Sequence, residues 1–525
     1  MRLFVDAFFL LSIFFSTMLV PIRGECALSE ETTEVPLYGI YEKTFQHNKF
    51  YKNAYRDVVA EALIKTPSNN LVRVALFWYG DGSWVVRFSP DEVGLFEYSI
   101  KSNDDNLSGQ KGSFRVVRST LKGGIKVHSK NQHHFEYQDG TPFYFIGDTE
   151  WSLFTDNMEE DHTRMSVIKY IERRSQQHFN VVTAQLMHQF GWNNVGGPPF
   201  NDFKQEIINT KYWEEVDWRI RFLTDHGITA GLLLSWASNP GGYDYSQFKQ
   251  MDAIERYAKY IASRYSAYNV YFIVAGEFDE AQYDYGKVGK AIRAGDPHKR
   301  MIGIHGTSST KSFANRDWCD FADYQQMYED LYRKIIEVKN INKPAVNSEY
   351  AYYLRDMNGD GHIDKPNSGS IDDIRKSSWQ IAMAGGYFVT GFGTTYLGGG
   401  RNPGAFRVDE EKNADWENQV QHIRKIFSQF EWWKLLPYNE ILMAPHRKQY
   451  VLAERDKHYL IYTEGQEKSI KVKLSIPSST KLKIVRLNPR NSEAEEVTAL
   501  SDGKVIEIVV PNSFDWLYLI EHVPA

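Results

Sequence analysis

Cysteine is almost absent from this chain of 525 residues, which contains only Cys26 and Cys319. Cys26 follows an apolar N-terminal segment, so no framework of disulfide bonds is expected to hold the fold together. Hydrophobic residues make up 42% of the chain, which is enough to bury a large core in two or three domains. We therefore expect a protein whose stability comes from hydrophobic burial.

The chain also lacks an excess of positive charge. Its 61 lysine and arginine residues are balanced by 67 aspartate and glutamate residues, which gives a net charge of -6. Nucleic-acid binding relies on clustered cationic side chains, so nucleic acid is not an expected partner. No Gly-x-Gly-x-x-Gly opens a helix after a strand, and neither His-Glu-x-x-His nor Gly-x-Ser-x-Gly occurs. These absences argue against a dinucleotide fold, a metalloprotease and a serine hydrolase.

Only one long apolar run occurs, from Phe4 to Val20, and it follows Arg2. Pro21 and a small or polar stretch come next, which is typical of a secretory signal peptide. We expect a signal peptide over residues 1–26, followed by secretion or export to the periplasm. An uncleaved membrane anchor is the alternative, but the run is short for a span and contains Asp6. No later segment reaches about 18 consecutive apolar residues, so no membrane span is expected in the mature chain.

Short alternating runs occur near both ends of the chain. Trp84 to Phe88 is an example in residues 32–118, and Tyr459 to Tyr462 is an example in residues 441–525. Alternation of apolar and polar residues between turn residues is typical of β-sandwiches. The pattern therefore predicts one β-sandwich over residues 32–118 and another over residues 441–525.

Between these modules, over residues 125–440, β-like apolar runs alternate with helical periodicity. Such alternation is typical of βα units around a parallel sheet, and eight units in about 300 residues favour a closed barrel over an open sheet. The predicted fold class is therefore α/β, a (β/α)8 TIM barrel flanked by N-terminal and C-terminal β-sandwich domains. The eight strands are expected at Phe143 to Ile146, Val181 to Leu186, Thr229 to Leu234, Val270 to Ala275, Met301 to Ile304, Phe321 to Tyr324, Ala345 to Asn347 and Tyr387 to Thr390.

In such a barrel the active site lies at the carboxyl ends of the strands. Glu277 follows the fourth predicted strand and Glu349 follows the seventh, so the two carboxylates are expected to face each other across the opening. Cleavage of a glycosidic bond needs an acid to protonate the leaving oxygen and, for retention, a second carboxylate as nucleophile. We predict Glu277 as the acid/base and Glu349 as the nucleophile, hydrogen-bonded by Tyr328. Substrate contacts are predicted for the polar and aromatic residues near the strand ends, namely Asp148, Trp151, His188, Trp192, Trp236, His305, Tyr328 and Tyr396.

Each of these residues also has an ordinary structural interpretation. Acidic residues are common on loops, and Asp279 and Glu280 are local rivals for the role of Glu277. Aromatic residues at strand ends also pack beneath loops. The joint position of two glutamates at two strand ends is what favours the catalytic interpretation.

Four motifs resemble those of a known family. They are Phe145 to Trp151 (FIGDTEW), Phe179 to Gln185 (FNVVTAQ), Val274 to Glu277 (VAGE) and Asn347 to Tyr350 (NSEY). Together they resemble the apiosidase-like glycoside hydrolases of family 140, whose barrel is related to the large retaining clan A. This resemblance implies a carboxylate after strand four and another after strand seven, at the positions of Glu277 and Glu349.

The resemblance extends to the flanking modules but includes one departure. Residues 35–114 resemble the Ig-like module often found ahead of such barrels, and the ending Asp515-Trp516-Leu517 resembles that of a collagen-binding type of module. The apiosidase-like pattern has Asp after a Gly-Gly pair, whereas this chain has Glu277 after Ala275 and Gly276. Clan A usually has Asn where this chain has Gly276. Glu277 keeps a carboxylic acid at this position, but its side chain is one methylene longer than that of Asp. The resemblance therefore does not imply apiose as the substrate.

One acidic loop resembles a calcium-binding loop. Residues 356–364 match the first nine positions of an EF-hand-type loop, with Gly361 at the sixth position and Asn367 in place of the usual Glu at the twelfth. The pattern fits a structural Ca²⁺ site without a catalytic role, and a solvated acidic turn is the alternative. No cofactor is expected to be required. The candidate calcium ligands are Asp356, Asn358, Asp360, His362 and Asp364.

These features predict a retaining glycoside hydrolase that acts on a polysaccharide or oligosaccharide of plant, algal or bacterial origin. The alternative is a non-catalytic carbohydrate-binding protein built on a degenerate barrel. A protease acting on collagen-like chains is disfavoured, because two carboxylates at barrel strand ends fit acetal cleavage better. The expected partner is thus a carbohydrate, and the sequence supports no prediction of the oligomeric state.

Overall fold

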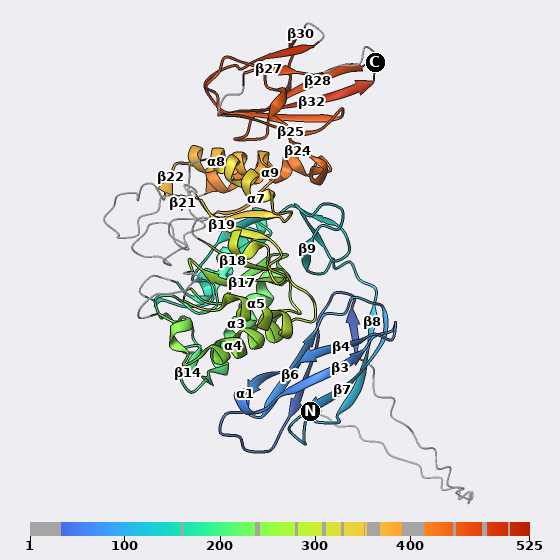
Figure 1. The fold of residues 1–525 in the computed structure, drawn as a ribbon, viewed down its shortest axis with the longest axis vertical. Coiled ribbons are helices and arrows are strands. Elements are labelled where there is room, and N and C mark those ends of the chain that lie inside the picture. Colours follow the sequence, from blue (N-terminus) through green and yellow to red (C-terminus); the bar gives the residue numbers. More distant parts are fainter. Residues whose placement is uncertain are drawn as a thin grey trace, which may run out of the picture.

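The computed structural model describes residues 33–524 except 159–161, 237–241, 279–281, 307–310, 327–329, 351, 354–367, 391–413, 445–447, 475–479 and 502–503. Figure 1 shows three parts along the long axis, with an N-terminal β-domain in blue at one end and a C-terminal β-domain in red at the other. A barrel lies between them. Within the described ranges, no helix is both long and apolar enough to cross a membrane.

The N-terminal domain is a β-sandwich. Alternation along β7 (Gly94–Ser102) buries Phe96, Tyr98 and Ile100, as the period of two along a strand requires. Phe96 stacks on Phe114 with ring centroids 5.0 Å apart. The first sheet has the order β1 (Glu34–Pro36), β8 (Lys111–Val117), β7, β3 (Ala60–Lys65) and β4 (Leu71–Ala75). The second has the order β2 (Tyr41–Gln46), β6 (Ser83–Phe88) and β5 (Phe77–Gly80), and a short helix, α1 (Ala54–Asp57), joins the sheets.

The central part is a closed barrel of eight parallel strands, which confirms the predicted fold class. A bridge between Gly306 and Tyr324 joins the fifth strand to the sixth and closes the ring. The strand residues are almost all buried, because one face of each strand fills the barrel and the other meets the helices. In order around the barrel the strands are β12 (Ile146–Thr149), β13 (Val181–Gln185), β16 (Thr229–Leu233), β17 (Val270–Gly276), β18 (Ile302–His305), β19 (Ala322–Gln325), β20 (Ala345–Glu349) and β23 (Tyr387–Thr390).

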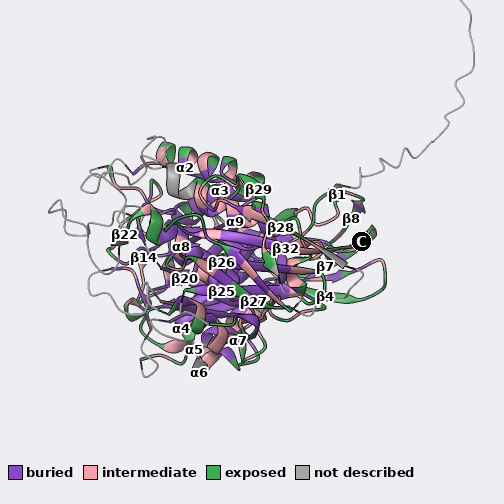
Figure 2. Cartoon of the chain, turned by 90° about the horizontal axis from the view of Figure 1, so that it is seen from above, coloured by how far each residue is buried: buried purple, intermediate pink, exposed green. Residues whose placement is uncertain are grey.

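Helices cover the outside of the barrel, and Figure 2 shows buried residues concentrated in the strands and on the inner faces of the helices. One helix, for example, buries a single apolar face made of Ile254, Tyr257, Ala258, Ile261 and Tyr265. The helices are α2 (Arg164–Gln176), α3 (Thr210–Asp225), α4 (Met251–Tyr265), α5 (Tyr285–Gly295), α6 (Lys311–Ala314), α7 (Leu331–Lys339), α8 (Ile371–Met383) and α9 (Ala414–Phe427). Short elements between them are β14 (Phe200–Asp202), β15 (Ile207–Ile208), η2 (Tyr245–Gln247), β21 (Tyr352–Tyr353) and β22 (Ser368–Gly369).

The prediction for the first barrel strand is wrong by three residues. Phe143 belongs to a small antiparallel sheet ahead of the barrel, and the barrel strand begins only at Ile146. The apolar run is continuous across both elements, so periodicity alone places the end of the strand too early. The small sheet consists of β9 (Ile125–Val127), β10 (Phe135–Tyr137) and β11 (Pro142–Phe143).

The C-terminal domain is again built from two antiparallel sheets around its own apolar core. A segment with two 3-10 turns, η4 (Trp432–Lys434) and η5 (Asn439–Ile441), leads into it from α9. One sheet contains β24 (Leu436–Pro437), β25 (Gln449–Glu454), β26 (His458–Thr463), β32 (Trp516–Pro524), β28 (Thr480–Leu487) and β29 (Ala494–Glu496). The other contains β27 (Ser469–Lys473), β31 (Val505–Val509) and β30 (Leu500–Ser501).

Buried ion pairs tie both β-domains to the barrel. Asp217 of α3 accepts hydrogen bonds from Arg87 of the N-terminal sandwich at 2.7 Å and from Arg264 of α4 at 2.7 Å. At the other end, Arg375 of α8 donates to both carboxylate oxygens of Asp515, at 2.7 and 2.9 Å. These contacts fix both β-domains against the helices of the barrel.

Candidate active site

Glu349 is the last residue of β20 and is buried, with 3% of its surface exposed. The hydroxyl of Tyr352 donates a hydrogen bond of 2.9 Å to its Oε1, and Nε2 of His305 lies 3.1 Å from its Oε2. Tyr328, which we predicted as its partner, lies outside the described residues. The carboxylate is therefore held at both oxygens by residues from two other segments of the barrel rim.

His305 ends β18 and lies between two buried carboxylates. Its Nδ1 is 2.7 Å from the hydroxyl of Ser348 and 3.4 Å from Asp323, while its Nε2 contacts Glu349. Burial alone would lower the pKa of His305, but the hydrogen bonds and charges of Asp323 and Glu349 outweigh it and raise the pKa to about 10. His305 therefore places a positive charge beside the Glu349 carboxylate at neutral pH.

Glu277 directly follows β17 at the mouth of the barrel, where part of the residue is open to solvent while its carboxyl group is largely buried among its neighbours. Its backbone has a φ of 41°, a left-handed conformation that is rare outside glycine and recurs at functional sites. The backbone N–H donates to the carbonyl oxygen of His305 at 3.0 Å, which anchors this turn to the fifth strand. The position of Glu277 is thus fixed by the backbone of the rim.

Two side chains hold the carboxyl group of Glu277. The indole of Trp236 and the amide of Gln325 both hydrogen-bond to it. Loss of hydration around the carboxyl group and the negative charge of Glu349 raise the pKa of Glu277, while the charge of His305 opposes this effect. The surroundings of Glu277 accordingly favour the protonated form of its carboxyl group.

The two glutamates belong to one connected group. Gln325, the last residue of β19, is the ladder partner of Glu349, and its side chain hydrogen-bonds to Glu277. Neighbouring strands lie about 4.8 Å apart, so the backbone of Gln325 is close to Glu349. Its side chain extends from there to Glu277. The fourth, fifth, sixth and seventh strands thus all contribute to a single cluster around Glu277 and Glu349.

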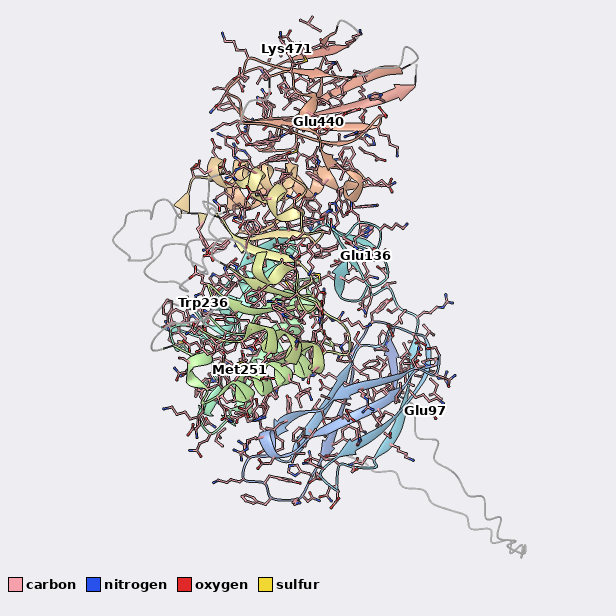
Figure 3. All side chains as sticks on the ribbon, viewed as in Figure 1. Glu97, Glu136, Trp236, Met251, Glu440 and Lys471 are labelled. Atoms are coloured by element: carbon pink, nitrogen blue, oxygen red, sulfur yellow. The ribbon has the colours of Figure 1, made fainter. Side chains whose placement is uncertain are left out.

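Trp236 and Trp151 form the floor beside this cluster. Their rings meet edge to face with centroids 5.0 Å apart, and each centroid lies 5.9 Å from that of His305. Figure 3 labels Trp236 at the side of the barrel, at the end of the third strand. Trp151 is fully buried and donates its indole N–H to the hydroxyl of Tyr352 at 3.2 Å. Trp151 therefore supports the site from below instead of offering the predicted stacking face to a sugar.

Gly276 explains how Trp236 fits at this point. A Cβ atom on Gly276 would lie 2.6 Å from the nearest ring atom of Trp236, well inside van der Waals contact. The absence of a side chain at this position lets the indole cross the end of β17 and reach Glu277. The departure from the clan A pattern, Gly276 in place of Asn, thus has a local physical reason.

Two further predicted substrate contacts form a separate unit at the end of β13. The rings of His188 and Trp192 stack with centroids 4.3 Å apart, and His188 Nε2 lies 3.0 Å from the hydroxyl of Ser152. Burial lowers the pKa of His188 to about 3, so this histidine is neutral. Trp192 is half-buried and leaves part of its ring accessible.

Asp148 does not join the cluster around the two glutamates. It lies within β12, where it accepts a hydrogen bond from Tyr170 at 2.7 Å and pairs with Arg174, both of α2. The carboxylate is fully buried between the barrel wall and this helix. The prediction of a substrate contact is therefore corrected, and the cause is the misplaced end of the first strand.

The remaining predicted residues lie outside the described ranges. They are Tyr328, Tyr396, the rival acids Asp279 and Glu280, and the calcium-loop residues Asp356, Asn358, Asp360, His362 and Asp364. Within the ranges that are described, no three His, Cys, Asp or Glu residues come together as a metal site. Calcium binding stays a prediction.

Comparison with known proteins adds family information to this geometry. The model of the apiosidase-like catalytic domain matches residues 129–434, and that of a domain of unknown function (DUF5060) matches residues 34–103. A candidate glycoside hydrolase from Bacteroides vulgatus has a similar structure, with 18% identity, a TM-score of 0.78, and coverage of 94% of this chain and 100% of that one. A glycoside hydrolase family 5 protein of the same organism has 17% identity, a TM-score of 0.65, and coverage of 76% and 93%. No curated protein matches the chain.

Proposed function

The chain belongs to the family of the apiosidase-like catalytic domain and is a glycoside hydrolase, and from this premise we propose a retaining mechanism that uses Glu277 and Glu349. In this mechanism Glu349 is the nucleophile and Glu277 is the general acid and base. The substrate is proposed to be a polysaccharide or oligosaccharide of plant, algal or bacterial origin.

In the first step an oxygen of Glu349 forms a bond to the anomeric carbon as the glycosidic C–O bond breaks. The leaving oxygen takes the proton from Glu277. The contacts around the two acids support this division. Tyr352 and His305 contact the two carboxylate oxygens of Glu349, whereas the surroundings of Glu277 raise the pKa of its carboxyl group.

In the second step Glu277 removes a proton from water, and the water oxygen displaces Glu349 from the sugar. Formation of the glycosyl ester removes the negative charge of Glu349, which is one of the two causes of the raised pKa of Glu277. The pKa of Glu277 therefore falls at the point where a base is needed. The same pair of residues thus supplies an acid in one step and a base in the next.

A single observation carries this proposal. The charge of Glu349 acts on Glu277, and both acids share contacts with His305 and Gln325. In retaining enzymes the two carboxyl groups are about 5 to 5.5 Å apart, against about 6.5 to 9.5 Å in inverting ones, and the effect of the charge of Glu349 on Glu277 supports a close pair.

Isosteric substitution of the two acids tests the proposal. Wild type, Glu277→Gln and Glu349→Gln would be incubated with a panel of polysaccharides and oligosaccharides, and reducing ends would be measured. Both variants are expected to lose nearly all activity. Glu172→Gln, on the exposed face of α2, is the matched control and should retain it. Undiminished cleavage by either active-site variant would refute the assignment and favour a catalytic role for other residues.

We also propose that the protein is exported. The apolar run from Phe4 to Val20, followed by Pro21, supports a cleaved signal peptide. N-terminal sequencing of the protein recovered from its native host should give a start near residue 27. A start at Met1 would contradict the proposal.

A further inference from the structure

A chain of polar side chains leads from the inside of the barrel to Glu349. It starts at Asp323, which lies within β19 and has a side chain that is only 1% exposed. The hydroxyl of Ser348 donates a hydrogen bond to Oδ1 of Asp323, and Nδ1 of His305 lies 3.4 Å from the same oxygen. A buried carboxylate is thus in contact with the histidine that lies beside Glu349.

The fold makes no other visible use of the Asp323 side chain. Its Oδ2 is buried and has no hydrogen-bond partner within the described part of the chain. The only basic side chain in contact with the carboxylate among those residues is that of His305. Burial of a carboxylate is costly unless a positive charge or several hydrogen bonds offset it. Asp323 and His305 therefore depend on each other.

The hydrogen bonds determine which ring nitrogens of His305 carry hydrogen. A carboxylate only accepts hydrogen bonds, so the hydroxyl hydrogen of Ser348 points to Asp323. The Ser348 oxygen then accepts a hydrogen bond from Nδ1 of His305, which is 2.7 Å away. On the other side of the ring, Nε2 lies 3.1 Å from Oε2 of Glu349. When Glu349 is a carboxylate, both ring nitrogens donate, and the ring is in its cationic form.

The charged groups around the ring favour this form. The carboxyl groups of Asp323 on β19 and Glu349 on β20 face its two nitrogens, and the carboxyl group of Glu277 also interacts with its charge. Two tryptophan rings with centroids 5.9 Å away are uncharged. Burial lowers the pKa of His305, but the hydrogen bond to Asp323 and then that to Glu349 raise it to about 10.

We propose that Asp323 is a positioning residue for the reaction. With Ser348, it fixes the ring of His305 so that Nε2 faces Glu349 and the positive charge of the ring stays beside both glutamates. The ring then orients the attacking carboxylate in the first step. Its charge also lowers the pKa of Glu277, which helps this residue to act as a base in the second step. The roles of the two glutamates rest on the proposed function.

A double-mutant cycle on the full chain tests this proposal. Wild type, Asp323→Asn, His305→Gln and the double variant would be compared on the glycan identified by the panel. Asparagine keeps an oxygen that accepts from Ser348 but removes the charge, so kcat should fall on the order of 10²-fold while KM stays unchanged. Because Asp323 acts through His305, the double variant should be no slower than His305→Gln. The alkaline limb of kcat/KM should move to higher pH in all three variants, since each weakens or removes the positive charge beside Glu277.

Asp320→Asn is the matched control. Asp320 lies two residues before β19, at the end of the strand opposite the active site, and pairs with Arg293. The same loss of charge at this position should leave the alkaline limb as in wild type. If Asp323→Asn does not fold, Ser348→Ala breaks the same chain of contacts and should move the limb in the same direction. An additive loss in the double variant, or an alkaline limb unmoved by these substitutions, would overturn the proposal.

Nitrogen NMR of isotope-labelled histidine gives a test that needs no substrate. At about pH 8, above the usual range for histidine, the wild type should show hydrogen on both ring nitrogens of His305, with signals assigned by their absence in His305→Gln. Asp323→Asn or Ser348→Ala should lose this state at the same pH. A wild-type ring with hydrogen on one nitrogen only would overturn the proposal even in an active enzyme. A ring with both N–H groups in a chain that cleaves nothing would contradict the proposed function and leave the link between Asp323 and His305 in place.

Discussion

The contact between Gly276 and Trp236 offers a sharp test of how Glu277 is positioned. In a Gly276→Ala variant the new Cβ would lie 2.6, 2.7 and 3.0 Å from three atoms of the indole ring. Ordinary carbon contacts are about 3.5 to 4.0 Å, so the ring would have to move by roughly 1 Å. Trp236 is 4% exposed and packs against Trp151, so the movement must also shift its hydrogen bond to Glu277.

The size of the effect follows from this displacement. A misplacement of about 1 Å in a catalytic group costs on the order of 10²-fold in rate, while overpacking costs about 1 to 3 kcal/mol of stability. The hydrogen bond from Trp236 lowers the pKa of Glu277, so its loss should raise that pKa further. Because Glu277 must be protonated to act as the acid, the alkaline limb of kcat/KM should move to higher pH.

The assay is a pH–rate profile of wild type, Gly276→Ala and a matched control. Gly286→Ala on α5 is suitable, because its nearest neighbour is a flexible carboxylate atom of Asp284 at 3.2 Å. Adding Trp236→Phe to Gly276→Ala should relieve the clash without restoring the hydrogen bond. The reasoning would be refuted by a Gly276→Ala enzyme of normal rate, or by one that is slow with an unmoved alkaline limb.

Three other predictions concern the site and its supports. Tyr352→Phe removes a hydrogen bond to the nucleophile and should lower kcat roughly 10- to 100-fold while leaving the circular dichroism spectrum intact; an unchanged kcat would argue against the assigned nucleophile. His305→Gln removes a positive charge that lowers the pKa of Glu277, so the alkaline limb of kcat/KM should move upward; a downward shift would contradict this sign. Asp515→Asn leaves Arg375 without its buried counter-charge and should destabilise the protein by about 3 to 5 kcal/mol in denaturant unfolding; a loss below about 1 kcal/mol would show that the pair is not stabilising the domain contact.

The barrel was predictable from the sequence because its signals are local. Each strand is a short run of buried apolar residues and each intervening helix has an apolar face, as in α4. The first strand was the exception. Its apolar run begins in β11, and its central part contains Gly147 and Asp148. A Cβ at Gly147 would lie 2.8 Å from the side chain of Val389, so the small residue reflects a contact with the last strand that no local pattern reveals.

The site was predictable only in part, for a similar reason. Glu277 and Glu349 could be found because strand ends mark the rim of a barrel. Tyr352 and Asp323 were missed, because their roles arise from contacts between different segments. An acidic residue such as Asp323 at a position that a barrel strand buries was the available signal. Trp151 was predicted as a sugar contact, but tertiary packing buries it.

The configuration of the first product tests the central claim most directly. Once the panel has identified a cleaved glycan, proton NMR during the first minutes of hydrolysis would show which anomer is released before mutarotation. With Glu349 as nucleophile and Glu277 as acid and base, two displacements occur and the released sugar should keep the configuration of the substrate. Release of the opposite anomer would mean that water attacks directly, which would contradict the role assigned to Glu349.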